Sequence, residues 1–362
     1  MLFIVDVRDV NGKILIVNIT KTLYWRNNEL YLLDQRLLPA REEYLRQSNI
    51  KQVWLSINTL VVRGAPAIGV AAAYGSLTGL HEHFALSKED FRHKYISQAE
   101  YLMTSRPTAV NLSNALNIMI TLCSKSIANS AEQLYLELEA RAVALHGEDI
   151  EMNRLIGLYG ADLIFDGCRV LTHCNAGAMA STGIGTALAP IYTAYKNGVK
   201  LAVYADETRP LLQGARITSW ELMKTGVDVT LVCDNMAADL MSRKMVDMVI
   251  VGCDRVAING DTANKIGTHT LAVTARHFGI PLYIAAPSST IDPNTRSGSN
   301  IIIEQRSWEE VTCFGGCSTA PYGIKVYNPS FDVTPNTLIT GFITERGIIG
   351  PPYDFSRGFS DE

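Results

Sequence analysis

The 362-residue sequence lacks several features that define specialised classes of protein. It has no apolar run approaching the length of a bilayer-spanning helix, so we expect no membrane segment. Its seven cysteines are an odd number without paired spacing, which suits a reducing compartment better than a disulfide framework. Neither sign of charge dominates, because 32 basic residues face 36 acidic ones. This balance argues against a nucleic-acid partner bound through overall charge.

The start of the chain also lacks the pattern of a secretion signal. The first ten residues, MLFIVDVRDV, contain Asp6, Arg8 and Asp9, which place charge where a signal peptide is apolar. We therefore expect a cytoplasmic protein.

Sequence signals for a metal or a nicotinamide cofactor are also missing. Cys313 and Cys317 in CFGGC have no matching second pair, and His81 and His83 in LHEHF fit an exposed helix face better than a set of ligands. The glycines of CNAGAMASTGIG do not follow the G-x-G-x-x-G order of dinucleotide sites. No cofactor is predicted.

The first part of the chain, residues 1–154, predicts a small sheet followed by a helical region. Its first forty or so residues alternate apolar and polar side chains, as in KILIVNIT and ELYLLDQ, which is typical of short antiparallel strands. The rest is helical in pattern. SAEQLYLELEARAVALHGED places Leu134, Leu138, Ala142 and Leu145 on one stripe.

The second part, residues 155–362, has a different pattern of apolar residues. Apolar, β-branched runs recur as RVLTHC, KLAVYA, DVTLVC, MVIVGC and PLYIAA. Helical stretches lie between most of them, and several of these end in glycine. Buried strands that alternate with helices indicate an α/β domain with a mainly parallel sheet, covered on both faces.

Polar or ionisable residues follow each of the five apolar runs. The carboxyl ends of parallel strands share one edge of a sheet, and ligands bind outside that edge. In chain order the groups are Cys174-Asn175, Asp206-Glu207-Thr208-Arg209, Asp234-Asn235, Cys253-Asp254-Arg255 and Pro287-Ser288-Ser289. One or two would be ordinary loop chemistry, whereas five in succession predict a site.

Two of these residues could carry chemistry. Cys174 ends an apolar run before a glycine-rich turn into a helix, where backbone N–H groups stabilise a thiolate or a phosphate; a buried structural cysteine is the alternative. Asp254 follows MVIVGC, where poor solvation would raise the pKa of its carboxyl and suit it to acid–base work. A salt bridge with Arg255 or a helix cap is the alternative for Asp254.

Four further stretches offer ligand contacts, although each alone could be a solvated loop. VVRGAPAIG combines an arginine with closely approaching backbone, and SRPTAVNLSNA, ETRPLLQGARIT and INGDTANKIGTHT offer cationic or amide groups near helix starts. The candidate contacts are Arg63, Gly64, Ala65, Arg106, Gln213, Asn264 and Lys265. Together with a thiol and a carboxylate, they suit a small, phosphorylated, polyhydroxylated substrate.

Seven stretches together resemble the methylthioribose-1-phosphate isomerases, which are relatives of the regulatory subunits of the eukaryotic initiation-factor guanine-exchange complex. They are VRGAPAIGVAAAYG, RPTAVNL, LTHCNAGAMASTGIGTAL, ADETRPLLQGARITSWEL, CDNMA, NGDTANKIGTHTLAV and VYNPSFDVTP. The similarity runs from about Leu33 to Ile349. It implies a homodimer with an N-terminal helical region and a C-terminal Rossmann-like domain, acting in methionine salvage.

The resemblance also implies roles for the candidate residues. Cys174 and Asp254 would be the catalytic pair, and the seven candidate contacts would hold the substrate. A ribose 1-phosphate has no free aldehyde, so the ring must open while the phosphate stays attached. Asp254 could protonate the ring oxygen, and Cys174 could act as a base or assist a hydride shift from C2 to C1. Neither route needs a metal or an organic cofactor.

The sequence departs from the family pattern at two places. Asn114 and Ile118 stand where the family usually has Trp and Arg, and Cys253 precedes Asp254 where alanine is common. The first departure leaves the 5-substituent open, with 5-deoxyribose 1-phosphate or another 5-modified ribose 1-phosphate as the alternative substrate.

Three other functions fit the sequence less well. An isomerase of ribose 1,5-bisphosphate would need a second basic cluster, which the sequence does not offer. A non-catalytic sugar-phosphate or nucleotide sensor would need neither Cys174 nor Asp254. A cysteine hydrolase would need His173 beside the thiol, but adjacent strand residues point to opposite faces.

Overall fold

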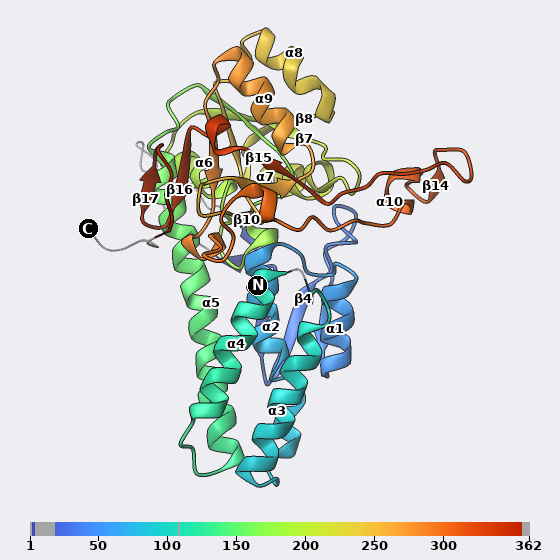
Figure 1. Ribbon diagram of the computed structural model, residues 1–362, viewed down its shortest axis with the longest axis vertical. Coiled ribbons are helices and arrows are strands. Elements are labelled where there is room, and N and C mark those ends of the chain that lie inside the picture. The colour runs from blue at the N-terminus through green and yellow to red at the C-terminus, as the bar shows by residue number, and fades with distance from the viewer. Residues whose placement is uncertain (1, 4–18, 108, 357–362) are drawn as a thin grey trace. The chain divides into compact units, whose positions relative to one another are not determined.

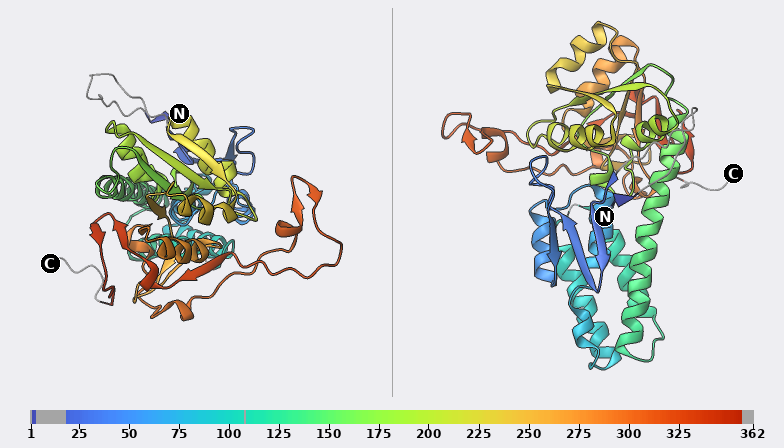
Figure 2. Two further views of the ribbon diagram at one scale, coloured as in Figure 1. Left: turned by 90° about the horizontal axis from the view of Figure 1, so that it is seen from above. Right: turned by 180° about the vertical axis from the view of Figure 1, so that it is seen from behind.

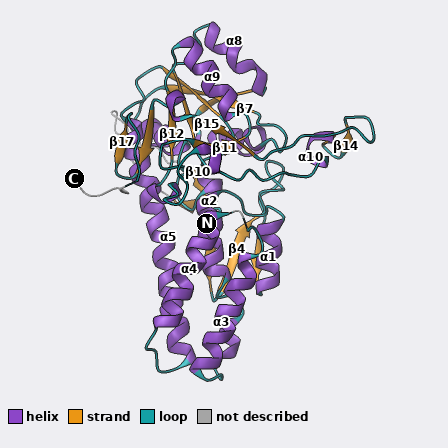
Figure 3. Cartoon of the chain, in the orientation of Figure 1, coloured by secondary structure: helices purple, strands orange, loops and turns teal. Residues whose placement is uncertain are grey.

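The structure, a computed structural model, describes residues 2–3, 19–107 and 109–356 (Figures 1 and 3). Most of the expected strand KILIVNIT lies outside the described residues. The described residues form two units. The first comprises Ile19–Arg154, Ala178–Gly185 and the strand β1 (Leu2–Phe3), and the second comprises Leu155–Gly177 and residues 186–356. Within the described residues, no helix combines the length and the apolar character needed to cross a membrane.

The first unit contains the small antiparallel sheet that the alternating pattern predicts. Its strands are β3 (Leu23–Arg26), β4 (Glu29–Leu33) and β5 (Tyr44–Gln47), while β2 (Ile19–Thr20) pairs with β1. Leu30 and Leu32 of β4 are fully buried, as residues two apart on one face should be.

The helices of the first unit pack around one apolar core. They are α1 (Ile50–Asn58), α2 (Ala65–Gly75), the 3₁₀ turn η1 (Leu80–His83), α3 (Lys88–Met103), α4 (Val110–Lys125) and α5 (Ala131–Ala161), whose residues from Leu155 onward belong to the second unit. Leu134, Leu138 and Ala142 on α5 are fully buried and Leu145 is half-buried against the same core, which confirms the predicted stripe. The small residues of α2 let it pack closely, because Gly69 lies against the backbone of Asn111 in α4.

The second unit is built on a seven-stranded sheet in the order β17-β16-β12-β9-β6-β7-β8. All five predicted strands are present and parallel, and the fold class is confirmed. In chain order the strands are β6 (Cys168–Thr172), β7 (Leu201–Asp206), β8 (Asp228–Val232), β9 (Met248–Val251), β12 (Leu282–Ala285), β16 (Gly341–Thr344) and β17 (Gly347–Ile349). The prediction of burial is wrong for β8, which is an edge strand with mostly exposed side chains.

The remaining elements connect these strands or extend from them. The helices are α6 (Leu188–Lys196), α7 (Ser219–Thr225), α8 (Ala237–Ser242) and α9 (Thr268–Phe278). A second sheet joins β10 (Arg255–Val256), β11 (Thr262–Lys265) and β15 (Phe331–Thr334). The arm that carries α10 (Glu309–Thr312), β13 (Cys313–Phe314) and β14 (Cys317–Ser318) extends away from the sheet of its own unit (Figure 2).

Candidate active site

Cys174 and Asp254 follow β6 and β9, two neighbouring parallel strands, at the same edge of the sheet. The loop after Cys174 and the loop before Asp254 are in contact. A Cβ added to Gly252 would lie 2.7 Å from the Cβ of Ala176, so only hydrogen at this position lets the loops approach so closely. The sheet therefore brings the loop after Cys174 against the loop before Asp254.

The backbone of Cys174 is strained and is held on both sides. Its φ angle is +63°, in the left-handed region that side chains other than glycine rarely adopt. Its N–H donates to Thr208 Oγ1 at 2.8 Å, and its carbonyl accepts from Thr218 Oγ1 at 2.5 Å. Thr208 has a φ of +65° itself. Strain of this kind costs about 1–3 kcal/mol per residue and clusters at functional sites.

The glycine-rich stretch after Cys174 is explained by close packing. Asn175 Nδ2 donates to Glu221 and to Thr218 Oγ1, and a Cβ on Gly177 would lie 2.2 Å from Glu221 Oε1. The predicted helix after this stretch is present as α6, which begins at Leu188. The intervening segment, Ala178–Gly185, packs within the first unit instead of continuing into the helix.

Asp254 is half-buried, and its N–H donates to the Ala263 carbonyl at 2.9 Å. The adjacent Arg255 forms an ion pair with Asp292 at 3.4 Å. Burial raises the pKa of the neighbouring Cys253 thiol well above its ordinary value, and the charge of Asp254 raises it further. Cys253 is therefore a neutral thiol at neutral pH and a poor candidate for a second nucleophile.

Gln213 lies on a loop that folds back tightly on β7. It is 5% exposed, and its Oε1 is buried without a hydrogen-bond partner among the described residues. It immediately precedes a π-helical turn, η3 (Gly214–Thr218), a feature often found at functional sites. An unsatisfied buried acceptor costs about 1–3 kcal/mol, which a ligand hydroxyl could recover.

The close packing of Gly214 leaves no room for a side chain. A Cβ there would lie 1.6 Å from the Asp206 carbonyl oxygen, so Gly214→Ala must displace backbone. We expect it to lower the free energy of unfolding by about 3 kcal/mol, measured by urea denaturation. Gly350→Ala is the control, because nothing lies within 4 Å of its added Cβ. Equal stability of the two variants would contradict the tight turn.

Asn264 and Lys265 lie at the end of β11, which corrects the expectation that they begin a helix. Helix α9 begins three residues later, at Thr268, whose Oγ1 accepts from Asn264 Nδ2 at 2.9 Å. The Lys265 Nζ lies 5.1 Å from the centre of the Phe331 ring on the paired strand. Strand pairing and ring contact together fix the direction of this cation.

The other candidate contacts belong to the first unit. Arg63 precedes α2, Ala65 is the first residue of α2, and Arg106 lies between α3 and α4. Gly64 has a φ of +90°, and a Cβ there would lie 2.3 Å from the Ala180 carbonyl oxygen. The VRGAP stretch is therefore packed against the Ala178–Gly185 segment, part of the glycine-rich stretch that follows Cys174.

A buried carboxylate anchors that segment within the first unit. Asp149 on α5 accepts the N–H of Thr182 at 2.8 Å and its hydroxyl at 2.6 Å. Burial raises the pKa of Asp149, and the hydrogen bonds from Thr182 oppose this.

Sequence reasoning missed the polar network beneath Cys174. Thr208 supports the Cys174 backbone, and Asp234 accepts the N–H groups of Thr208 and Arg209, each at 2.7 Å. The signal was present, because these residues follow β7 and β8 at the same sheet edge. Their role as supports for one another depends on contacts that the sequence does not reveal.

Among the residues that the structure describes, one group has the composition of a metal site: His173, Asp206 and Asp234, whose ligand atoms lie within 4.8 Å of one another. His173 Nδ1 lies 2.9 Å from Asp206 Oδ2, which is a direct hydrogen bond and leaves no space for an ion between them. Both oxygens of Asp234 already accept backbone N–H groups. The group fits a hydrogen-bonded network better than a metal centre.

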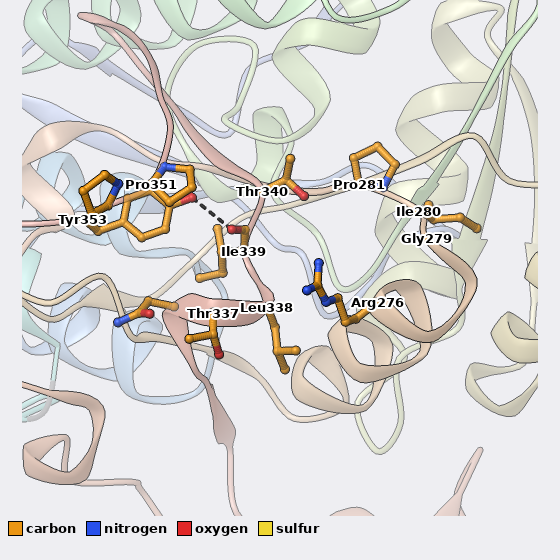
Figure 4. Close-up of a pocket in the computed structure, with 12 residues that line it drawn as sticks. Arg276, Gly279, Ile280, Pro281, Thr337, Leu338, Ile339, Thr340, Pro351 and Tyr353 are labelled. Atoms are coloured by element: carbon orange, nitrogen blue, oxygen red, sulfur yellow. Dashed lines mark hydrogen bonds between the residues drawn. The ribbon is translucent and has the colours of Figure 1, made fainter.

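A separate pocket of about 690 Å³ lies at the opposite edge of the sheet, where β12 and β16 begin (Figure 4). Pro281, Ile339 and Tyr353 contribute to its wall, and Arg276 is the one charged side chain among the described residues that line it. Tyr353 Oη donates to the Ile339 carbonyl at 3.0 Å, as the dashed line shows. The described residues of the lining include no cysteine and no carboxylate, so the candidate active site remains the edge with Cys174 and Asp254.

Comparison with known proteins agrees with this fold. Residues 61–351 match the Initiation factor 2 subunit family, and the chain belongs to that family. Within it, the chain is 53% identical over 335 residues to the methylthioribose-1-phosphate isomerase of Thermotoga maritima, covering 92% of this chain and 96% of the relative.

Similar solved structures include one described as an isomerase and one described as a translation initiation factor subunit. The 5-methylthioribose 1-phosphate isomerase of Pyrococcus horikoshii OT3 superposes with a TM-score of 0.87 at 42% identity, covering 94% of each chain. A structure described as translation initiation factor eIF-2B, subunit delta, from A. fulgidus gives 0.84 at 41% identity, covering 92% of this chain and 97% of that one. The comparisons confirm the family resemblance and the enzyme class, an isomerase.

Proposed function

We propose that the chain converts 5-methylthioribose 1-phosphate to 5-methylthioribulose 1-phosphate. The observation that carries this is the similarity of nearly the whole chain, at 51–53% identity, to relatives named methylthioribose-1-phosphate isomerase. The site adds support, since a half-buried carboxylate and a thiol follow neighbouring strands at one sheet edge.

Asp254 is proposed as the general acid and base. It protonates the ring oxygen as the bond between that oxygen and C1 breaks, and the phosphate stays on C1. Hydrogen then moves from C2 to C1 while the C2 hydroxyl loses its proton, which leaves a ketone at C2. Cys174 assists this transfer, either as the base that takes the C2 proton or by shaping a dry site for a hydride shift.

The candidate contacts are proposed to hold the substrate. Gln213 offers a buried acceptor, Oε1, that has no hydrogen-bond partner in the described part of the chain, which suits a sugar hydroxyl. Lys265 and Asn264 at the end of β11, with Arg63, Gly64, Ala65 and Arg106 from the first unit, supply cationic and backbone groups for the phosphate and the ribose. We also propose a homodimer that works in the cytoplasm, as the family resemblance implies.

A second candidate substrate is favoured by the departures on α4. Asn114 and Ile118 lie four residues apart there, and both are exposed, with Ile118 at 41%. If this face of α4 determines the 5-substituent, 5-deoxyribose 1-phosphate or another 5-modified ribose 1-phosphate is the preferred substrate.

Turnover of four sugar phosphates, followed by ³¹P and ¹³C NMR, tests the proposal. The compounds are methylthioribose 1-phosphate, 5-deoxyribose 1-phosphate, ribose 1-phosphate and ribose 1,5-bisphosphate. Highest kcat/KM on the first supports the proposed function, and highest kcat/KM on the second supports the alternative. If none is converted, a non-catalytic sensor becomes the better description.

A further inference from the structure

His173 is a buried side chain that joins three loops carrying candidate site residues. Its ring is 1% exposed. Nδ1 lies 2.9 Å from Asp206 Oδ2, at the end of β7, and Nε2 lies 2.9 Å from the Ile266 carbonyl, just after Lys265. Its own backbone continues into Cys174. A single imidazole thus connects the ends of β6, β7 and β11.

The contacts around the ring are closely fitted. A Cβ on Gly267 would lie 2.9 Å from His173 Cε1, so a side chain at this position would crowd the ring. Gly267 also has a φ of +106°, a conformation that favours glycine. On the other side, the Asp206 carbonyl accepts from Thr208 Oγ1 at 3.0 Å, and that hydroxyl oxygen receives the Cys174 N–H. The same Asp206 carbonyl packs against Gly214, next to Gln213.

We propose that His173, paired with Asp206, is a positioning residue that sets the Cys174, Gln213 and Lys265 loops relative to one another. The inference rests on the proposed isomerase function and deepens it. His173 does not activate the thiol, because both of its ring nitrogens face other partners. It acts by tying together the three loops that must meet the substrate at once.

The charges facing His173 favour its protonated form. They come from Asp206 on β7, Asp234 after β8 at 4.0 Å, and Asp332 on β15, which accepts the N–H groups of Gly267 and His269. Burial alone would lower the pKa of His173, but the hydrogen bond and charge of Asp206 outweigh it and raise the pKa. Nε2 faces a carbonyl and must carry hydrogen, so the Nδ1 proton is the one that titrates.

This proton has a defined effect on stability. Burial also raises the pKa of Asp206, against the opposing hydrogen bond from His173, so the folded pair binds protons more tightly than the unfolded chain does. The contribution of His173 is therefore fully present below about pH 6.5, its unfolded value, and is lost as the pH rises through the folded pKa.

Three variants separate the two hydrogen bonds from the charge. His173→Asn can still donate where Nδ1 did, to Asp206, but loses the Ile266 carbonyl. His173→Gln reaches the Ile266 carbonyl but loses Asp206. Asp206→Asn keeps both hydrogen bonds with a neutral ring, because the new amide can donate to Nδ1. Asp247→Asn is the matched control, since it weakens the Arg169–Asp247 ion pair (2.7 Å) at the opposite end of β6.

We expect both His173 variants to lower kcat/KM on methylthioribose 1-phosphate by about 10- to 100-fold, the scale seen when a residue that orients a reactive group is lost. Asp206→Asn should retain more activity than either. It should also lack the alkaline fall in kcat/KM that loss of the shared proton produces in the parent. Asp247→Asn should lower stability without changing kcat or KM.

Amide hydrogen exchange provides a readout that does not depend on turnover. His173→Asn should speed exchange in 264–268, and His173→Gln in 206–214, relative to the parent and to Asp247→Asn. His173 variants with kcat/KM within twofold of the parent, or losses that merely follow stability as in the control, would overturn the inference. If the parent converts no sugar phosphate, the proposed function fails, and unchanged exchange in both segments would separately overturn the positioning role.

Discussion

Asp254→Asn should lower kcat at least ~100-fold, the usual scale for a positioned proton-transfer group, while the sugar phosphate still binds. The amide keeps the shape of the carboxylate but is too weak an acid to transfer a proton to the ring oxygen. The Asp254 N–H bond to the Ala263 carbonyl involves only backbone and survives the change. Steady-state kinetics with calorimetric binding measures both quantities on the same protein.

Two controls make this result specific. Asp247→Asn is the same chemical change at the other end of the sheet and should leave kcat intact. Lys265→Ala should mainly raise the Kd of the substrate, because it removes a cation without touching the acid. Normal turnover of Asp254→Asn, on a substrate that the parent accepts, would show that another group protonates the ring oxygen.

The parallel sheet could be predicted because its strands carry their own signal. Runs such as MVIVGC are buried on both faces, and β9 is buried along its whole length. β16 and β17 gave no comparable signal, and neither did the second sheet of β10, β11 and β15. The strands β10 and β17 have only two and three residues, so their pairing is set by neighbouring segments and not by a periodic pattern.

The candidate site was predictable only in part. Strand ends in a parallel sheet share an edge, which placed Cys174 and Asp254 together from sequence. The support beneath Cys174 was not predictable, because Thr208 is 34 positions away and its role depends on a left-handed φ and a 2.8 Å hydrogen bond. The packing of Ala178–Gly185 within the first unit was not predictable for a related reason. Its contact with Gly64 is a close approach of backbone, which leaves no pattern in either segment.

The strained backbone of Cys174 is held by contacts that leave its side chain out. The residue holds a φ of +63° because its N–H and carbonyl are both bound by threonine hydroxyls, and neither bond involves the thiol. A change confined to Sγ should therefore preserve the loop. Cys174→Ser tests the chemistry of the side chain with little disturbance of its position.

Cys174→Ser should lower kcat at least ~100-fold, since a serine hydroxyl is a far weaker acid than a thiol and cannot supply a comparable base. Cys168→Ser, a change of the same kind at the start of β6, should cost stability in the core yet leave kcat unchanged.

The route of hydrogen transfer is read from the parent in D₂O. Deuterium at C1 of the product indicates proton abstraction, and its absence indicates a hydride shift. Under proton abstraction, Cys174→Ala should be no more active than Cys174→Ser, because neither side chain is a useful base. Under a hydride shift, the apolar Cys174→Ala should keep the site drier and exceed Cys174→Ser. A Cys174→Ser variant with normal turnover would remove the thiol from the mechanism under either route.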